Sequence, residues 1–571
     1  MASSPPVDSE TSDGLQAQTV VSDASSAEVS SESPTRIRAR HAASRDRSPG
    51  WSSGGYALAI VCGILIVLGV LLRVWLLGNA PMNSDEATAG LVAHQIAHGH
   101  TYAFYWGQSY GSVEPYVVAL NFLAFGQSPF ILNATPALLA LVGSVLVWRI
   151  GLRLFQPAAA VVAAVLSWIW SESSLWNSTR EYGLHEVTMV LGLVLLLAGL
   201  RILQKARDEE ADRLFDWVVI GAAGGLGFWA SPEIVYFVVP AALTAALSLR
   251  RQSLIDAATR VGLAVGAAFI GVMPWIWATV TRRGSGIPPS PVTYFSRLGT
   301  FFSHVLPMIL GLRVEGVGLW EGGHVFGTIA YAFVVVLVLS GAVLLVIRQR
   351  DAWILVLTLA MYPFLYAAFP TSWFWNDGRY GLSLTPILSL VIAGGLWQMV
   401  RPAVAAWVGA VLLLLACAST LVAFNDGYGA IGTPSELTSF TANPNTQVTA
   451  LADELDRLGI SHAYAGYWVA NDLTFMSDGR VTALALTEGR NPPGATNARA
   501  KDVAWVFVPD ASVGAVASQT GSASGLQPGT LTETQLIGWL NAHGVPYHRH
   551  TVRGFDVVVP ERNVSPTAVT G

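Results

Sequence analysis

The sequence predicts a polytopic α-helical membrane protein that ends in a soluble α/β domain. Of its 571 residues, 52% are hydrophobic and only 12% are charged, whereas soluble globular proteins have about 25% charged residues. Apolar runs close to the ~20 residues needed to cross a bilayer recur through the first three quarters of the chain and then stop. We therefore expect a membrane domain over residues 51–424, with about eleven transmembrane helices, and a soluble domain over residues 425–571.

The charge balance and the cysteines argue against two other classes of protein. The net charge of −5 leaves no basic excess of the kind that binds nucleic acid. Cys62 and Cys417 both lie inside apolar runs, so the sequence predicts no disulfide framework.

Residues 1–50 are predicted to form a disordered cytoplasmic tail. They are rich in Ser, Ala, Asp, Glu and Pro and have almost no large apolar side chains, so they cannot bury enough surface to fold. Five arginines between Arg36 and Arg47 precede the first apolar run. Because basic residues mark the cytoplasmic ends of membrane helices, we expect the N-terminus in the cytoplasm.

Eleven apolar runs are candidates for membrane-spanning helices. Their middles are nearly free of charged residues, as the hydrocarbon core of a bilayer requires. The candidates are Tyr56–Leu77, Leu132–Leu154, Pro157–Ser171, Leu184–Leu203, Trp217–Ala230, Ile234–Leu249, Val261–Val280, Val325–Ile347, Trp353–Phe369, Leu382–Val400 and Ala403–Phe424.

A twelfth apolar run, Val113–Phe125, is predicted not to cross the membrane. It is short and is interrupted by Glu114 and Pro115, which suits an interfacial or re-entrant helix. Without it, the basic loops after Leu154, Leu203, Leu249, Ile347 and Val400 all fall on the side of the N-terminal arginines, as the positive-inside rule requires. The same count places the C-terminal domain outside the cytoplasm.

The external segment Gly78–Ile131 carries two adjacent carboxylates, Asp85 and Glu86, shortly after the first predicted span. Acidic residues close to the membrane persist mainly where they line a functional cavity. The alternative is a solvated loop, or a helix cap made by Ser84 and Asp85. The pattern from Gly90 to His100 predicts a short amphipathic helix.

The external segments also carry arginines, histidines and many aromatic residues. These residue types suit the transfer of a sugar from a lipid phosphate to a hydroxyl group. A carboxylate can accept the proton of the hydroxyl, arginines can hold the departing phosphate, and aromatic rings can pack on sugars and lipid tails.

Six stretches resemble a known family: Asn83–His94, Gly107–Pro115, Thr179–Gly183, Gly227–Pro232, Asp377–Tyr380 and Tyr464–Leu473. In order and placement they are similar to bacterial GT-C membrane glycosyltransferases of the protein mannosyltransferase and aminoarabinose transferase superfamily. The resemblance covers most of residues 55–480. It implies a GT-C-like fold, a polyprenyl-phosphate-linked sugar donor, an acceptor that is a protein, lipid or glycan, and transfer on the extracytoplasmic face of the cell membrane.

The resemblance implies that Asp85 is the general base of an inverting hexosyl- or pentosyltransferase. Glu86 is the second catalytic candidate, and could instead position the acceptor or bind a cation. Substrate-binding roles are assigned to residues of the shared motifs and of the external loops: His94, Gln108, Tyr110, Glu114, Arg180, Glu186, Arg282 and Arg379.

Several of these residues have a second interpretation. A self-contained cluster of ion pairs explains Arg180 and Glu186 as well as substrate binding does. Arg282 and Arg379 could extend to lipid headgroups. His94 and His98 share a helical face and suggest zinc only weakly, because no cysteine accompanies them; no metal site is assigned, although the resemblance leaves a divalent cation open as a cofactor.

Two other functions fit the sequence less well. A transporter or flippase of lipid-linked sugars predicts internal repeats and charges inside the spans, which the sequence lacks. A non-catalytic membrane scaffold leaves the external charges unexplained.

In the C-terminal domain the sequence predicts helices at Val448–Leu458 and Thr532–His543. It predicts strands at His462–Trp468, Val503–Val508 and Phe555–Val559, with a Ser/Gly-rich loop over Ala511–Gly529. Tyr467 and Trp468 are expected in the core of this domain.

Overall fold

The computed structural model describes most of the chain from Ser53 onward. The described residues are 53–106, 110–208, 212–250, 252–281, 290–315, 318–373, 377–432, 445–486, 491–492, 495–508 and 531–570. The predicted N-terminal tail and the predicted loop Ala511–Gly529 lie outside these residues.

Nine helices of the described chain are long and apolar enough to cross a membrane, which confirms the prediction of a polytopic helical protein. Where a short 3-10 helix leads into an α-helix, the two are counted as one span. The nine are α2 (Ser53–Asn79), α5 (Pro129–Leu154), α8 (His185–Arg207), η1 with α10 (Pro232–Leu249), α11 (Leu254–Val280), α14 (His324–Arg348), η3 with α15 (Arg350–Ala368), η5 with α16 (Gly378–Met399) and α17 (Pro402–Gly432).

Two of the eleven predicted spans form shorter helices, α6 (Pro157–Ile169) and α9 (Leu214–Ala230). The run Val113–Phe125 forms a helix of 13 residues, α4. It is one of the shorter apolar helices, and its length is well below the ~20 residues that cross a bilayer.

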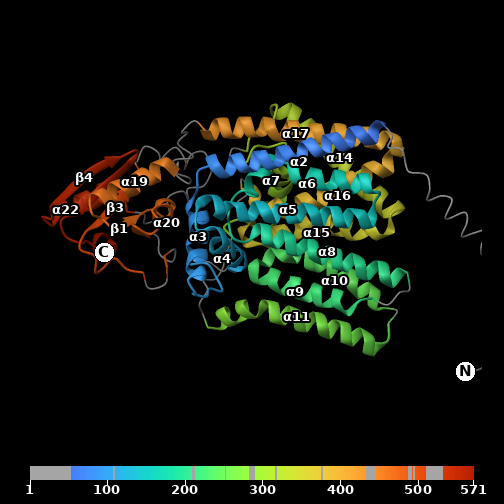
Figure 1. Cartoon of the computed structure of the whole chain (residues 1–571), viewed down its shortest axis with the longest axis horizontal. Helices are drawn as coiled ribbons and strands as arrows, with labels where there is room; N and C mark the ends of the chain where they lie inside the picture. The colour runs from blue at the N-terminus through green and yellow to red at the C-terminus, as the bar shows by residue number, and fades with distance from the viewer. Residues whose placement is uncertain are drawn as a thin grey trace, which may run out of the picture. The chain divides into compact units, whose positions relative to one another are not determined.

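The long helices differ in how much of their surface other helices cover. Of the apolar part of α8, 72% is buried, and of η5 with α16, 83%; these two helices lie inside the bundle. Only 11% of α11 is buried. Helices α8, α9, α10 and α11 run side by side (Figure 1). Since lipid tails are as apolar as the helices, an outer position suits an exposed apolar helix such as α11.

Glycines bring α9 and α11 together. A Cβ on Gly221 or Gly225 of α9 would lie 2.0 or 2.2 Å from a backbone oxygen of Ala264 or Ala268 in α11. Small residues spaced four apart let two membrane helices approach closely.

Short elements surround the predicted site. Helix α3 (Ser84–Ala97) begins six residues before the predicted start at Gly90, and its cap is Asn83 rather than Ser84 or Asp85. The Asn83 side chain accepts hydrogen bonds from the backbone N–H groups of Asp85 (3.0 Å) and Glu86 (3.1 Å). The other short elements are α7 (Glu172–Asn177), α12 (Tyr294–Thr300), η2 (Phe301–Val305), α13 (Leu306–Ile309) and η4 (Pro370–Trp373).

The C-terminal domain contains a five-stranded sheet in the order β2-β1-β3-β5-β4. Strands β1 and β2 and strands β1 and β3 are parallel, while β5 is antiparallel to β3 and β4. The strands are β1 (His462–Ala465), β2 (Thr482–Ala485), β3 (Val503–Phe507), β4 (Tyr547–Val552) and β5 (Phe555–Pro560), and the helices are α19 (Asn445–Arg457), α20 (Tyr467–Met476), α22 (Glu533–Ala542) and α23 (Pro566–Thr570).

Both faces of this sheet are covered. Ala504 and Val506 of β3 share a core with residues of α19 and α20. Val503 and Trp505 of the same strand pack in the core that contains α22 residues. This alternation is the period of two that a strand imposes, and it confirms the predicted α/β domain.

Most of the predicted C-terminal elements are present, and one was wrong in its extent. The expected strand His462–Trp468 ends at Ala465, and Tyr467 begins helix α20. Strands β2 and β4 were not predicted. The early end of β1 matters because Tyr467 and the residues after it form helix α20 instead of continuing the strand.

Candidate active site

Asp85 lies in the first turn of α3, and both of its carboxylate oxygens have partners. Arg379 donates from Nη1 to Oδ2 at 3.3 Å, and the Tyr467 hydroxyl donates to Oδ1. The side chain keeps 24% of its surface exposed. A helix N-terminus favours a negative charge in its first turn, so this position stabilises an accessible carboxylate.

Arg379 connects Asp85 with a second acid, Asp377. Its Nε lies 2.7 Å from Asp377 Oδ2, and its guanidinium lies over the ring of Tyr182, 4.5 Å from the centroid. The side chain is 17% exposed. Ion pairing and stacking on an aromatic face fix the plane of the guanidinium, and donors remain available for a ligand because arginine has five N–H groups.

Close packing explains why the Asp377–Tyr380 motif has a glycine at position 378. The Gly378 N–H donates to Glu315 at 3.0 Å, and a Cβ at this position would lie 1.9 Å from the Ser173 hydroxyl. Only glycine fits there, so it brings the backbone of Arg379 against the α7 segment.

Glu86 differs from its neighbour because it is fully buried. It accepts a hydrogen bond from Asn133 Nδ2 at 2.7 Å and pairs with Arg180 at 3.4 Å. Burial raises the pKa of Glu86 above its usual value, although Arg180 and Asn133 oppose this shift. The two adjacent carboxylates thus lie in different environments, one accessible and one enclosed.

Arg180 is enclosed with Glu86. Its Nη1 donates to the backbone oxygen of Pro81 at 2.6 Å, and its guanidinium lies 4.0 Å from the ring centroid of Trp176. Only 2% of the side chain is exposed. The ion-pair partner of Arg180 is therefore Glu86 of α3, whereas the sequence had grouped Arg180 with Glu186.

Glu114 and Glu181 form a buried pair of acids. Glu114 Oε2 accepts the backbone N–H of Val187 at 3.2 Å, and burial raises the pKa of Glu114 to about 7. Burial and then the charge of Glu114 raise the pKa of Glu181 well above its usual value. Two adjacent buried carboxylates cannot both ionise easily, so the pair favours keeping a proton at neutral pH.

Glu186 lies in the same interior region, at the start of α8. It is buried and lies close enough to Glu114 and Arg73 to interact with their charges. Nearby, His185 lies 3.3 Å from Glu233 and packs edge-on against the ring of Tyr380.

Two tyrosines of the first external segment also lie at the site. Tyr110 has Thr371 and Tyr380 as side-chain partners, and burial together with Glu233 raises its pKa to about 12. The buried Tyr105 hydroxyl lies against Gly183, where a Cβ would come within 1.3 Å of it. Gly183 therefore makes room for this ring.

Of the other predicted site residues, His94 lies away from Asp85. His94 lies nine residues further along α3, about 13 Å by the rise of a helix, where its ring packs on His98 with centroids 4.3 Å apart. Gln108 and Arg282 lie outside the described residues.

The sequence did not single out several residues that the structure brings to the site: Asn133, Glu233 and the hydroxyl of Tyr467. Tyr467 was expected only as core, and it does pack partly against the core of its own domain. The polar Asn471 and Asp472 in the same stretch were the signal that this segment faces something other than the sheet.

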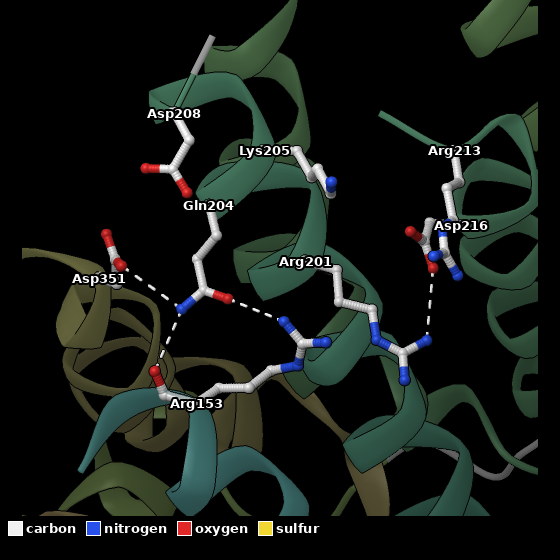
Figure 2. A pocket seen from close by; sticks show the side chains of 8 residues that line it. All are labelled: Arg153, Arg201, Gln204, Lys205, Asp208, Arg213, Asp216 and Asp351. Carbon is white, nitrogen blue, oxygen red and sulfur yellow. Dashed lines mark hydrogen bonds and ion pairs between the residues drawn. The ribbon is translucent and has the colours of Figure 1, made fainter. Parts of the chain in front are cut away.

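In the part of the chain that the structure describes, no three His, Cys, Asp or Glu side chains are placed to hold a metal ion. A second polar region lies at the other end of α8, where side chains from three helix connections line a cavity of about 460 Å³. Figure 2 shows Gln204 at its centre, bonded to Arg153 and Asp351, beside the Arg201–Asp216 pair. The cavity is lined by Arg153, Arg201, Gln204, Lys205, Asp208, Arg213, Asp216 and Asp351.

Comparisons with known proteins bear on this fold. The family model described as dolichyl-phosphate-mannose-protein mannosyltransferase matches residues 111–277. The apo crystal structure of ArnT from Cupriavidus metallidurans is similar, with a TM-score of 0.57, 13% identity, and coverage of 89% of this chain and 98% of that chain.

The structure of the same protein bound to undecaprenyl phosphate matches with a TM-score of 0.55, 12% identity and the same coverage, 89% and 98%. No curated protein sequence matches the chain. These findings confirm the resemblance that the sequence indicated: the chain has the GT-C fold of ArnT, and its residues 111–277 match the mannosyltransferase family model.

Proposed function

We propose that this protein is an inverting glycosyltransferase that moves a sugar from a polyprenyl-phosphate donor to a hydroxyl group of a protein, lipid or glycan. Residues 51–424 form the catalytic membrane domain in this proposal, and residues 425–571 form an extracytoplasmic domain. The match to a mannosyltransferase family model and the similarity to a protein whose structure holds undecaprenyl phosphate support a polyprenyl-phosphate-dependent transferase in general.

The observation that carries the proposal is the environment of Asp85. Glu86, Glu114, Glu181 and Glu186 are buried, whereas Asp85 keeps 24% of its surface exposed while Arg379 holds one of its oxygens. A general base must be ionised and must reach the proton that it takes. Among these five acids, Asp85 alone is accessible, and its contact with Arg379 favours the ionised form.

At the acceptor, the reaction needs only a general base from the protein. The hydroxyl oxygen attacks the anomeric carbon as its proton moves to Asp85, the bond from that carbon to the phosphate oxygen breaks, and polyprenyl phosphate leaves with the bonding electrons. Attack from the face opposite the leaving phosphate inverts the anomeric centre. A phosphate leaves without protonation by an acid, so one carboxylate suffices.

Arg379 is our candidate for the donor phosphate, ahead of Arg180. Its side chain is 17% exposed, against 2% for Arg180. Because Asp85 and Asp377 take two of its five donors, the remaining N–H groups can bind phosphate oxygens. Tyr110 and Tyr182 add aromatic surface beside it, which suits a sugar ring.

The membrane orientation is part of the proposal. Four basic residues, Arg153, Arg201, Lys205 and Arg213, come together at the end of α8 away from Asp85 (Figure 2). The positive-inside rule then assigns that end to the cytoplasm and the Asp85 end to the outside.

Cysteine labelling tests the orientation. Cys62 and Cys417 are buried, so single cysteines can be introduced at the exposed positions Ser461 and Arg250. We expect a membrane-impermeant maleimide to label Ser461→Cys in intact cells and Arg250→Cys only after lysis. The opposite pattern would reject the proposed topology.

Turnover of defined donors tests the activity. Purified protein is incubated with synthetic undecaprenyl-phosphate-linked hexoses and pentoses and an extract of cell-envelope acceptors, and released undecaprenyl phosphate is measured. Envelope glycans with and without the gene are compared by mass spectrometry. We expect release from one donor and loss of the matching sugar; absence of both, in protein that binds undecaprenyl phosphate, would contradict the proposal.

A further inference from the structure

We infer that the C-terminal domain completes the active site, with Tyr467 as the positioning residue that holds the carboxylate of Asp85. This inference rests on the proposed function of Asp85 as the base. In this inference the C-terminal domain takes part in catalysis.

The two oxygens of Asp85 are held from two distant parts of the chain. Arg379, at the start of η5, donates to Oδ2, and Tyr467, at the start of α20, donates to Oδ1. Donors on both oxygens fix the plane of the carboxylate. The side chain is still 24% exposed, so a substrate hydroxyl can reach it.

Helix α20 presents one face to α3 through regularly spaced residues. Tyr467, Asn471 and Phe475 are four residues apart, which places them on the same side of a helix. Asn471 Nδ2 donates to Thr88 Oγ1 at 2.7 Å. The ring of Phe475 fills the space over Gly90, where a Cβ would lie 2.5 Å from it.

The contacts extend beyond α20. Phe475 stacks on Phe122 of α4, with ring centroids 6.4 Å apart. Asn445, at the start of α19, accepts the backbone N–H of Met82 at 2.9 Å. The C-terminal domain therefore contacts α3, the turn before it and the helix beside it, and these contacts fix the position from which Asp85 acts.

The alternative is that Tyr467 only packs. Its ring does lie against the core of its own domain, and phenylalanine would preserve that packing. The hydroxyl is therefore the part of the side chain that the substitution Tyr467→Phe tests.

Tyr464→Phe is a matched control. Tyr464 lies in the same domain, three residues earlier, and its ring packs on Trp505 at a centroid distance of 4.9 Å. The substitution removes a hydroxyl from the same domain at a position in β1, outside the α20 face that meets α3.

We expect Tyr467→Phe to lower kcat about 10-fold or more, as the loss of a hydrogen bond to a charged group predicts, with little change in KM for the undecaprenyl-phosphate donor. The acidic limb of the pH–rate profile should move to higher pH, because the lost donor stabilised the ionised carboxylate. Tyr464→Phe should match the wild type in both respects.

Combining the substitutions separates this inference from the proposed function. If Asp85→Asn retains near wild-type turnover, the base assignment itself fails. If Asp85→Asn is inactive while Tyr467→Phe has the kcat and pH profile of Tyr464→Phe, the positioning role is refuted. Tyr467→Phe should add no further loss in the Asp85→Asn background, since a residue that acts through Asp85 has no effect without it. The thermal unfolding midpoint of each variant shows whether the substitution has disrupted the fold.

Discussion

The two ends of helix α8 are both rich in charge, but the charges differ in sign and in burial. At the His185 end, the acids Glu86, Glu114, Glu181 and Glu186 are almost completely buried. At the Arg207 end, basic side chains predominate; Arg201 is 39% exposed and Arg207 is 54% exposed, and each pairs with an aspartate.

This difference indicates that the acidic end of α8 is a functional site, whereas the basic end only orients the helix in the membrane. Burying an ionised group costs several kcal/mol unless it is paired or neutralised, so four buried acids persist only where something compensates them or uses them. Exposed ion pairs cost and contribute little. The basic end needs no function beyond orienting the helix, whereas the acidic end calls for one.

The sharpest test of this comparison is Asp85, an accessible acid at the acidic end. Asp85→Asn preserves size and most hydrogen bonds but cannot take a proton, so transfer should fall by about 10²–10⁴ while undecaprenyl phosphate still binds. Release of undecaprenyl phosphate by purified, folded protein is the assay. Glu86→Gln should lower the transfer rate less, because Glu86 is enclosed. If Glu86→Gln is inactive while Asp85→Asn is active, Glu86 is the base instead of Asp85.

Arg379 is next in expected effect. Arg379→Ala should weaken binding of undecaprenyl phosphate by about 10-fold or more, the value of a lost charge-assisted hydrogen bond. Lysine should rescue binding only partly, because it lacks the planar fork. Titration of each variant with undecaprenyl phosphate measures this affinity, and Arg180→Ala is the comparison. If Arg180→Ala loses affinity while Arg379→Ala keeps it, the phosphate binds at Arg180 instead.

The buried acids predict a pH dependence of stability. The pKa of Glu114 rises from its usual value to about 7 on folding, and that of Glu181 rises in the same direction. Their stabilising contribution is thus present below the unfolded pKa of about 4.3 and is lost as the pH rises through 7.

Thermal unfolding between pH 5.5 and 8.5 measures this effect. We expect the midpoint of the wild type to fall by a few degrees toward pH 8.5, and Glu114→Gln, which stays neutral, to flatten that fall. Equal slopes for the two proteins would show that the Glu114 pair does not control the loss.

The smallest effect is expected at the basic end. Arg207→Ala removes an exposed ion pair with Asp351 and should change the free energy of unfolding by less than about 1 kcal/mol and leave donor turnover within about two-fold of wild type. A loss comparable to that of Arg379→Ala would mean that the basic end of α8 takes part in the reaction, and the comparison of the two ends would fail.

The sequence by itself determined the class of the fold and the candidate base. Apolar runs such as Val325–Ile347 reach membrane-spanning length whatever surrounds them, because bilayer thickness sets that length. The short apolar run Val503–Val508 similarly predicts a strand. Asp85 stood out because its motif and its place after the first span are both local features.

Tertiary structure alone decided which charged residues meet. Asp85 and Arg379 are almost 300 positions apart, and Tyr467 reaches Asp85 from another domain. Nothing in the local pattern distinguishes Asp85, which is accessible, from Glu86, which is enclosed by Asn133 and Arg180. Burial and pairing depend on how distant segments pack, and these set the free energy of a charge, so the roles of adjacent carboxylates follow from the fold and not from their order in the chain.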